Sequence, residues 1–281
     1  HRERSVEIME ETQKFSFDGR IIDHPPEIDD GKQVIRLGLQ IPDGRPFFIP
    51  KVSTMAGFRC WEKNEVEAAI KAPREPRKKQ FANRAIFHPN QNPQNSCAAA
   101  SAIMGLTRSY YLNGYEIPAL NWGYTYSFVN GGSDNGAQLK DVKLSLQRDG
   151  VCRIGPKGPK RIFRNQFDQE EIADAQNFMG LPDGLYEVDS ELEFATVILS
   201  GLGSGIVALD VTRNFLNQKD GDGIAVAGGG VGNHSICVDD ALPRFSSRGE
   251  IIWSNPESWG PDVLDEGTAL LTWDRHFAIP N

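Results

Sequence analysis

A short charged segment divides this chain of 281 residues into two parts of different character. Between Ala72 and Lys79 it holds two prolines and five charged side chains. Proline interrupts helices and cannot donate to a sheet, and so many charges cannot be buried together, so this composition disfavours regular structure. We therefore predict a linker over residues 73–80, between an N-terminal module of residues 1–72 and a main domain of residues 81–281.

The N-terminal module shows the alternation that is typical of strands. Apolar side chains recur at every second position from Ile35 to Ile41, and the strand character extends to Ile49. Asp18-Gly19 and Pro42-Asp43-Gly44 are typical of turns between strands. Only the stretch from Glu62 to Ala72 has helical character. The pattern predicts a small β-rich module that ends in a helix.

In the main domain, helical patterns come first and strand patterns follow. Ser96 can cap a helix that begins at Cys97 and ends at Tyr111, before Asn113-Gly114. Further helices are expected over residues 139–149, 170–179 and 190–199, and strands over residues 206–211, 235–238, 251–254 and 268–273. This order indicates an α+β fold in which a helical half faces a β half.

Charge and hydropathy exclude two classes of partner. The net charge is −8, and the acidic excess lies after the linker, so a nucleic acid is not an expected partner. The longest uncharged stretch, Phe194 to Leu209, is interrupted by three glycines and is too short to span a bilayer. We expect a soluble protein without a membrane segment.

One of the four cysteines is in a position to act as a nucleophile. No Cys-x-x-Cys pair is present, so neither a zinc site nor a dense disulfide framework is predicted, and no metal is expected. Cys97 lies at the expected N-terminus of a helix, where the helix dipole favours the thiolate. Cys60, Cys152 and Cys237 have no supporting motif and are assigned to packing.

An imidazole is needed to hold such a thiolate and to protonate a leaving group. His234 follows a glycine-rich loop at the head of an apolar strand and is the best placed of the five histidines. Asn255 and Glu257 lie at the end of the next expected strand, where either could orient the imidazole ring.

Four motifs in this order resemble those of the papain family of cysteine peptidases. They are Gln91 to Ala102 around the cysteine, Asn130 to Asp134, Asn233 to Val238 around the histidine, and Ser258-Trp259-Gly260. The resemblance covers roughly residues 81–275. It implies a papain-like two-lobed fold, with a helical lobe and a β-barrel-like lobe, preceded here by the β-rich module.

The resemblance implies a cysteine endopeptidase, a hydrolase that cleaves proteins or peptides without a cofactor. Cys97 is the nucleophile, His234 the general acid, and the side chain of Gln91 with the backbone N–H of Cys97 binds the oxyanion. The identity of the third catalytic residue, which orients His234, is left open. An alignment without a gap selects Glu257, whereas the chemistry of a thiolate-imidazolium pair favours Asn255. Because asparagine orients the ring without adding charge, we favour Asn255.

The resemblance also implies a substrate site. Gly131 and Gly132 would let an extended substrate lie against the backbone, because no Cβ stands in the way. Asn233 and Trp259 are expected to line the same site, with Trp259 covering the histidine contact from water.

The sequence departs from the family at several positions. Ala98 replaces the tryptophan that usually follows the nucleophile, and Gln94 and Val129 occupy the two positions of a family disulfide. The missing disulfide favours a reducing compartment. These departures keep open a structural or assembly protein of the same fold that uses residues 1–72 as its interface, and less so a hydrolase of cell-wall peptides.

Three further segments receive an interpretation from the sequence alone. The N-terminal module is expected to dock a partner and not to inhibit, because inhibitory segments of this family are generally helical. Asp220-Gly221-Asp222-Gly223 lacks the later ligands of a calcium loop and is interpreted as a turn. Lys157 to Arg164 is interpreted as a solvated basic loop.

Overall fold

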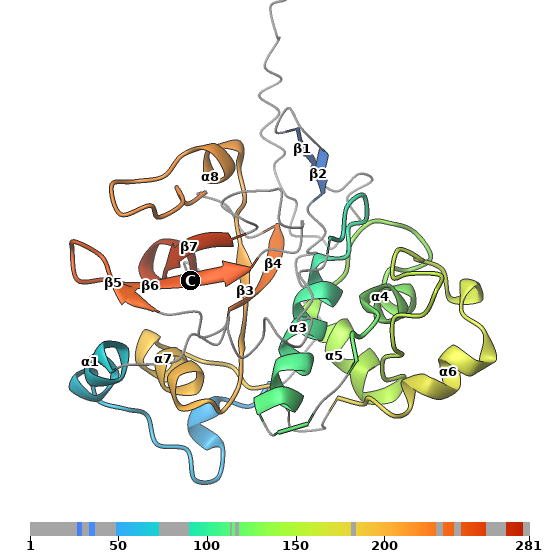
Figure 1. Ribbon diagram of the computed structural model, residues 1–281, viewed down its shortest axis with the longest axis horizontal. Helices are drawn as coiled ribbons and strands as arrows, with labels where there is room; N and C mark the ends of the chain where they lie inside the picture. The colour runs from blue at the N-terminus through green and yellow to red at the C-terminus, as the bar shows by residue number, and fades with distance from the viewer. Residues whose placement is uncertain are drawn as a thin grey trace, which may run out of the picture.

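The structure is a computed structural model of the chain. It describes residues 27–29, 34–36, 49–72, 90–112, 114–115, 118–180, 184–228, 233–238, 243–256 and 268–277. Helices α3 to α6 gather on one side and strands β3 to β7 on the other (Figure 1). We call these sides the helical half and the β half. The mixed helix and strand architecture predicted from the sequence is confirmed.

Among the described residues, the helical half is built by α3 (Cys97–Leu112), α4 (Trp122–Val129), α5 (Leu139–Arg148) and α6 (Gln169–Ala175). Helix α3 begins at the predicted residue. Helix α5 ends two residues before Gly150, whose φ of 70° is in the left-handed region that glycine adopts readily. Helix α6 ends four residues before the predicted Met179. The core between α3, α4 and α5 includes Trp122 and Tyr126.

The sequence did not predict helix α4. Its residues are mostly aromatic or β-branched, which is typical of strands, and six of its eight residues are buried. Asn121 caps it, because the side-chain oxygen accepts from the N–H of Tyr124 at 3.2 Å. Burial on nearly every side removes the periodicity by which a surface helix is recognised.

The β half contains two small antiparallel sheets. Strand β3 (Gly205–Leu209) pairs with β4 (His234–Val238), and β6 (Ile251–Pro256) lies between β5 (Arg244–Phe245) and β7 (Thr268–Thr272). Helices α7 (Glu191–Ser200) and α8 (Arg213–Asn217) and the short π-helix η3 (Trp273–Phe277) also lie in this half. Its core is built around Phe194 and Trp253, whose rings meet edge to face at 5.2 Å.

The described part of the N-terminal region has two components. Strands β1 (Glu27–Asp29) and β2 (Val34–Arg36) form an antiparallel pair. The rest of the predicted strand to Ile41, the predicted turns at Asp18 and Pro42, and the predicted linker over residues 73–80 lie outside the described residues. The β-rich module therefore stays a prediction.

Residues 49–72 pack directly on the β half. They hold the short turn η1 (Val52–Thr54) and the predicted helix α1 (Lys63–Lys71), which lies beside α7 (Figure 1). The N–H of Val52 donates to Glu187 O at 2.8 Å, and the N–H of Trp61 donates to Thr196 Oγ1 at 2.9 Å. Val66 is 1% exposed within the core of the β half. These residues therefore share a hydrophobic core with the strands.

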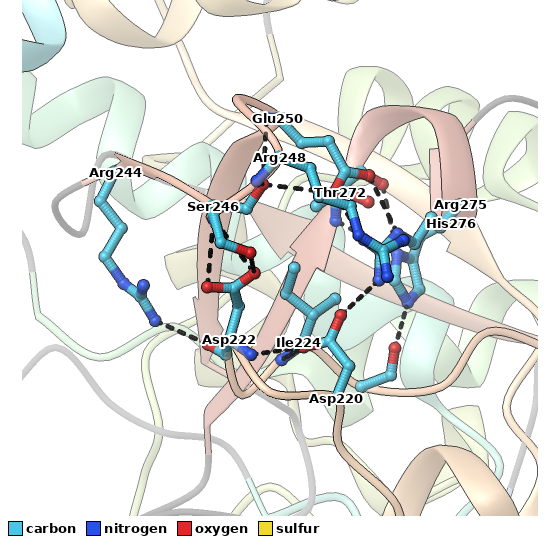
Figure 2. A network of polar contacts seen from close by, with 12 residues as sticks. Asp220, Asp222, Ile224, Arg244, Ser246, Arg248, Glu250, Thr272, Arg275 and His276 are labelled. Carbon is cyan, nitrogen blue, oxygen red and sulfur yellow. Dashed lines mark hydrogen bonds and ion pairs between the residues drawn. The ribbon is translucent and has the colours of Figure 1, made fainter.

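The predicted turn at Asp220 is confirmed. Asp220 Oδ1 accepts from the N–H groups of Asp222 and Ile224 at 2.9 and 3.0 Å. Figure 2 shows Arg275 between Asp220 and Glu250, bonded to both carboxylates. The single positive charge of Arg275 therefore offsets part of the charge of these two carboxylates. Within the described residues, no three His, Cys, Asp or Glu side chains are grouped so that they could hold a metal ion.

Among the described residues, no helix is both long enough and apolar enough to cross a membrane.

Candidate active site

Helix α3 lies against strand β4, and residues from the N-terminal part of each element are in contact. Near these ends Ser101 Oγ and Ser235 Oγ are hydrogen-bonded at 2.7 Å, and both side chains are buried. Further along, the buried Arg108 donates from Nη1 to Cys237 O at 3.3 Å. Together the two contacts fix both the spacing and the relative direction of the helix and the strand.

This arrangement places Cys97 and His234 at the same end of the pair. Cys97 precedes Ser101 by one helical turn, about 6 Å along the axis, and His234 is the strand residue next to Ser235, about 3.3 Å away. Both side chains are completely buried. The two residues predicted to carry the chemistry, 137 positions apart in the sequence, are thus held in one region by contacts of their own elements.

The predicted cap of α3 is wrong. The hydroxyl of Ser96 is buried and has no hydrogen-bond partner among the described residues, although Ser96 O accepts from the N–H of Ala100 at 2.9 Å as helix geometry requires. Since this hydroxyl does not bind the first-turn N–H groups, the positive end of the helix dipole at Cys97 is not offset by a cap from Ser96.

A tight turn places the carboxamide of Gln91 beside the segment that leads into α3. Gln91 is completely buried, its Nε2 donates to Gln94 O at 3.2 Å, and the N–H of Gln94 donates to Gln91 O at 2.7 Å. The predicted oxyanion donor is therefore held within the nucleophile segment and not on its surface.

Asp134 ties this segment to the glycine segment. Its Oδ1 accepts from the N–H of Asn95 at 2.9 Å and from the hydroxyl of Tyr126 at 2.8 Å, and its backbone oxygen accepts from Asn95 Nδ2. Burial, with the nearby Asp134 carboxylate second, raises the pKa of Tyr126, so its phenol keeps the proton that it donates. The hydroxyl also accepts from the N–H of Gly136 at 3.0 Å. We call this set the Asp134 tether.

Gly131 and Gly132 form the exposed turn between the tether and helix α4. Their φ angles are 66° and 84°, in the left-handed region that disfavours other residues. The side chain of Asn130 holds the turn, since its Oδ1 accepts from the N–H of Gly132 at 2.9 Å. A Cβ at either glycine would meet no atom within 4 Å, so the space above this backbone is open.

The side chain of Asn233 binds the protein itself. Its Oδ1 accepts from the N–H of Val211 at 2.9 Å, and its Nδ2 donates to Val211 O at 3.1 Å. These two bonds anchor the residue before His234 to Val211, two residues after the end of strand β3. Any contact that Asn233 makes with a ligand would therefore come from its backbone.

Asn255 lies in strand β6, which contacts β4. In Figure 1 the C-terminal end of β6 points toward β4. The side chain is completely buried, and neither its oxygen nor its nitrogen has a hydrogen-bond partner among the described residues. Glu257 and Trp259, the other predicted residues of this corner, lie outside the described residues.

Comparisons with known proteins identify the fold. No protein-family model matches the sequence, and neither does any curated protein. Among solved structures the chain is similar to xylellain, a cysteine protease from Xylella fastidiosa, at 15% identity and a TM-score of 0.57, over 84% of this chain and 89% of that one. It is also similar to procathepsin B of Trypanosoma congolense, at 15% identity and a TM-score of 0.56, over 84% and 80%. The chain has a papain-like fold.

A third neighbour, the digestive procathepsin L 3 of Tenebrio molitor larval midgut, is 15% identical with a TM-score of 0.53. The match covers 68% of this chain and 62% of that one. These neighbours are cysteine proteases or their proforms, and at this identity the likeness shows the papain-like fold alone.

All four thiols of this papain-like chain are free. Burial raises the pKa of Cys152 to about 12, with a further contribution from Glu171, so this thiol stays protonated. Cys237 is buried, and Cys60 is partly exposed beside Trp61. Where the family would place a disulfide between the nucleophile segment and the glycine segment, the Asp134 tether joins the two by hydrogen bonds.

Proposed function

We propose that this protein is a cysteine endopeptidase. The observation that carries the proposal is the pairing of α3 with β4 through Ser101 and Ser235, which brings Cys97 at a helix N-terminus to the same end as His234. A helix N-terminus and an imidazolium both favour the thiolate, which is the reactive form of cysteine.

The reaction follows from these groups. The Cys97 sulfur bonds to the carbonyl carbon of the scissile peptide, and the oxyanion accepts hydrogen bonds from the Gln91 carboxamide and the Cys97 N–H. Each such donor is worth about 2.7–4 kcal/mol in comparable sites. His234 gives its proton to the amine nitrogen as the carbon-nitrogen bond breaks. Water then attacks the thioester, His234 accepts a proton from it, and Cys97 leaves.

Asn255 is the proposed third member of the site. A buried carboxamide without a partner costs free energy, and such groups are usually retained for a role. Its oxygen would accept the second N–H of the His234 ring. Glu257 remains the alternative, and Trp259 would shield the contact in either case.

The substrate would lie extended along Gly131 and Gly132. The open space above these glycines supports this path, and Asn233 would contribute from its backbone. No cofactor takes part in this chemistry. We also keep, as proposals, the linker at residues 73–80 and a reducing compartment, since the Asp134 tether does not depend on an oxidised cysteine pair.

One observation favours a second function. Cys97, His234 and Gln91 are all completely buried, so a substrate cannot reach them without a movement of the chain. A structural or assembly protein of the same fold, which recruits its partner through residues 1–72, needs no such access.

Labelling with a thiol-directed epoxide separates the two functions. Such a reagent reacts with a thiolate-imidazolium pair, so we expect one modification, at Cys97, at neutral pH in the presence of reductant. The label should be lost in Cys97→Ser and strongly reduced in His234→Gln. Cys60→Ser is the matched control, because Cys60 is the thiol that a non-selective reagent reaches first. A chain that stays unlabelled while Cys60 reacts with iodoacetamide would be the assembly protein.

A further inference from the structure

The basic loop, residues 157–164, lies along one side of the candidate active site. Lys160 Nζ donates to Asn92 O, and Asn92 directly follows Gln91. Two residues further on, Ile162 O accepts from Asn130 Nδ2 at 2.6 Å, and Asn130 directly precedes the two glycines. The loop therefore bridges the nucleophile segment and the glycine segment, the two segments that would border a bound peptide.

The loop is held in place by close packing. A Cβ on Gly123 would lie 1.9 Å from Pro159 O, so only glycine at this position of α4 allows the loop to approach. Arg161 is buried, pairs with the carboxylate of Glu171 through both Nη atoms, and stacks on the ring of Phe167 at 4.1 Å. The positions of the neighbouring side chains are thus fixed by buried contacts.

The four basic residues of the loop differ in their partners. Arg161 pairs with Glu171, and Lys157 Nζ bonds Asp168 at 2.9 Å. Lys160 and Arg164 have no carboxylate partner among the described residues, and Arg164 stacks on the ring of Phe128 at 4.6 Å. The loop therefore carries two positive charges without a carboxylate partner among the described residues, one of them, Lys160, bonded to the nucleophile segment.

An exposed aromatic ring lies between these two charges in the sequence. Phe163 is 43% exposed, and it directly follows the residue that binds Asn130. The nearest acidic residue of the glycine segment, Asp134, is bonded to Asn95 and Tyr126 in its tether. The loop thus offers two cations and an apolar face next to an open stretch of backbone.

We propose that the basic loop borders the bound substrate and selects peptides with an acidic side chain near the scissile bond. The proposal rests on the proposed function for the site but concerns which peptide is bound. A substrate carboxylate would accept hydrogen bonds from Lys160 or Arg164 while its backbone follows the glycines. Since the net charge of −8 repels acidic peptides at long range, a local basic group is what would admit them.

Equilibrium binding to the full chain carrying Cys97→Ala tests the proposal. The probes are fluorescent peptides that carry Glu, or Gln in its place, at each of six successive positions. At one position the Glu peptide should bind about 1.5 to 5 times more tightly than its Gln partner, the range for an exposed charge pair. High salt should reduce that ratio, because exposed charges are screened.

Substitutions within the loop locate the effect. Lys160→Gln and Arg164→Gln together should bring the ratio to about one. Lys157→Gln is the matched control: it removes the same charge from the same loop, at a side chain paired with Asp168, and should leave the ratio unchanged. If Lys160→Gln disturbs the loop, Arg164→Gln alone should still lower the ratio, since the Arg164 guanidinium makes only a stacking contact among the described residues.

Three outcomes would overturn the proposal: equal binding of the Glu and Gln peptides at every position, a preference that survives the double substitution, or no binding of any peptide at millimolar concentration. Because the variant lacks the nucleophile, the result does not depend on turnover. An acidic preference in binding, together with a wild-type chain that cleaves none of the peptides, would refute the peptidase and leave the loop's selectivity standing.

Discussion

Asn255 keeps two buried polar atoms without a partner among the described residues. Each such atom costs about 1–3 kcal/mol relative to a satisfied one. Substitution of Asn255 would remove this cost in free energy. If the side chain orients His234, the same substitution would also lower activity. Activity and stability should therefore respond differently to the same change.

Asn255→Ala should lower peptide turnover by one to several orders of magnitude, as the loss of a third member does elsewhere. The melting temperature should change little, because the substitution removes two unsatisfied polar atoms along with some packing. Turnover across pH at saturating and subsaturating substrate measures the first effect, and thermal unfolding the second. Glu257→Ala is the comparison. If its turnover falls sharply and the alkaline limb of its pH profile moves to lower pH, while Asn255→Ala stays near the wild-type turnover, Glu257 orients the ring.

Glu191, at the start of α7, should make stability depend on pH near neutrality. Burial, followed by repulsion from Asp274 and Glu250, raises its pKa to about 7 from 4.5, although Lys63 and the helix N-terminus favour the carboxylate. The folded chain thus keeps a proton that the unfolded chain releases. The stability that this protonated carboxyl contributes is fully present below about pH 4.5 and is lost as pH rises through about 7.

Glu191→Gln should remove this loss. At pH 8 the variant should be more stable than the wild type by about 1–2 kcal/mol, a figure reduced for the partial solvation of the side chain, and at pH 4.5 the two should be equal. Denaturant unfolding at both pH values gives the difference. Glu170→Gln, which removes the same charge from an exposed position of α6, is the matched control. Equal differences at both pH values would contradict the assignment.

At the scale of elements, the Asp134 tether joins the nucleophile segment to the segment that follows α4. Asp134→Ala removes the acceptor of the Asn95 N–H and the Tyr126 hydroxyl, leaving two donors unsatisfied in a partly buried site. We expect a loss of about 1–3 kcal/mol in stability and a fall in kcat larger than the change in KM, because Gln91 and Cys97 lie on the loosened segment.

Asp134→Asn is the conservative comparison. Its side-chain oxygen can still accept both hydrogen bonds, so most of kcat should return. Steady-state kinetics and thermal unfolding of both variants decide the point. If Asp134→Ala lowers the melting temperature but leaves kcat intact, the tether supports the fold without positioning the nucleophile.

The sequence could predict the elements that are marked by a local pattern, but not those that depend on contacts with distant residues. Helices α3 and α5 have stop signals and apolar spacing within their own residues, and strands β4 and β6 are short apolar runs, so both kinds were predicted. Helix α4 was missed because its aromatic residues favour a strand and only packing makes it a helix. The motifs predict Cys97 and His234 as the reactive pair, which stays a prediction.

The contacts around the site could not be predicted in the same way. Asn95 and Asp134 are 39 positions apart, and Lys160 and Asn92 are 68 apart. No local signal marks residues that meet across such separations, and the hydrophobic pattern contains no information about them. For this reason the sequence alone indicates a solvated segment where the structure has the basic loop.

At the scale of the molecule, residues 49–72 determine where the chain can be shortened. A chain that starts at residue 77 loses α1, and with it the buried Val66 and the bond from Trp61 to Thr196. Burial of one such apolar side chain contributes about 1.5–3 kcal/mol. We expect this chain to melt many degrees lower than the full chain, and a chain that starts at residue 49 to melt within a few degrees of it. Equal melting temperatures for all three would show that α1 does not stabilise the β half.

The same comparison tests the role of the N-terminal residues. Only the chain that starts at residue 49 keeps the core of the β half intact while it removes residues 1–48. A large gain in small-peptide turnover in that chain would identify these residues as inhibitory, and unchanged turnover with altered partner binding would support docking. A loss of activity in the shorter chain would report unfolding.

Because the four thiols are free and the Asp134 tether consists of hydrogen bonds, a change in the oxidation state of a cysteine breaks no bond that holds the fold. In an enzyme in which a disulfide joins the nucleophile segment to the glycine segment, a reductant that keeps the nucleophile in its thiol form can also reduce that disulfide. Here no covalent cross-link contributes to the fold, and Cys152 is held as an unreactive thiol. In the proposed enzyme, peroxide that reaches Cys97 would form a sulfenic acid without breaking a bond that holds the fold, and a thiol reductant would restore activity without any refolding step. The same scaffold could then be switched off and on by the redox state of its surroundings.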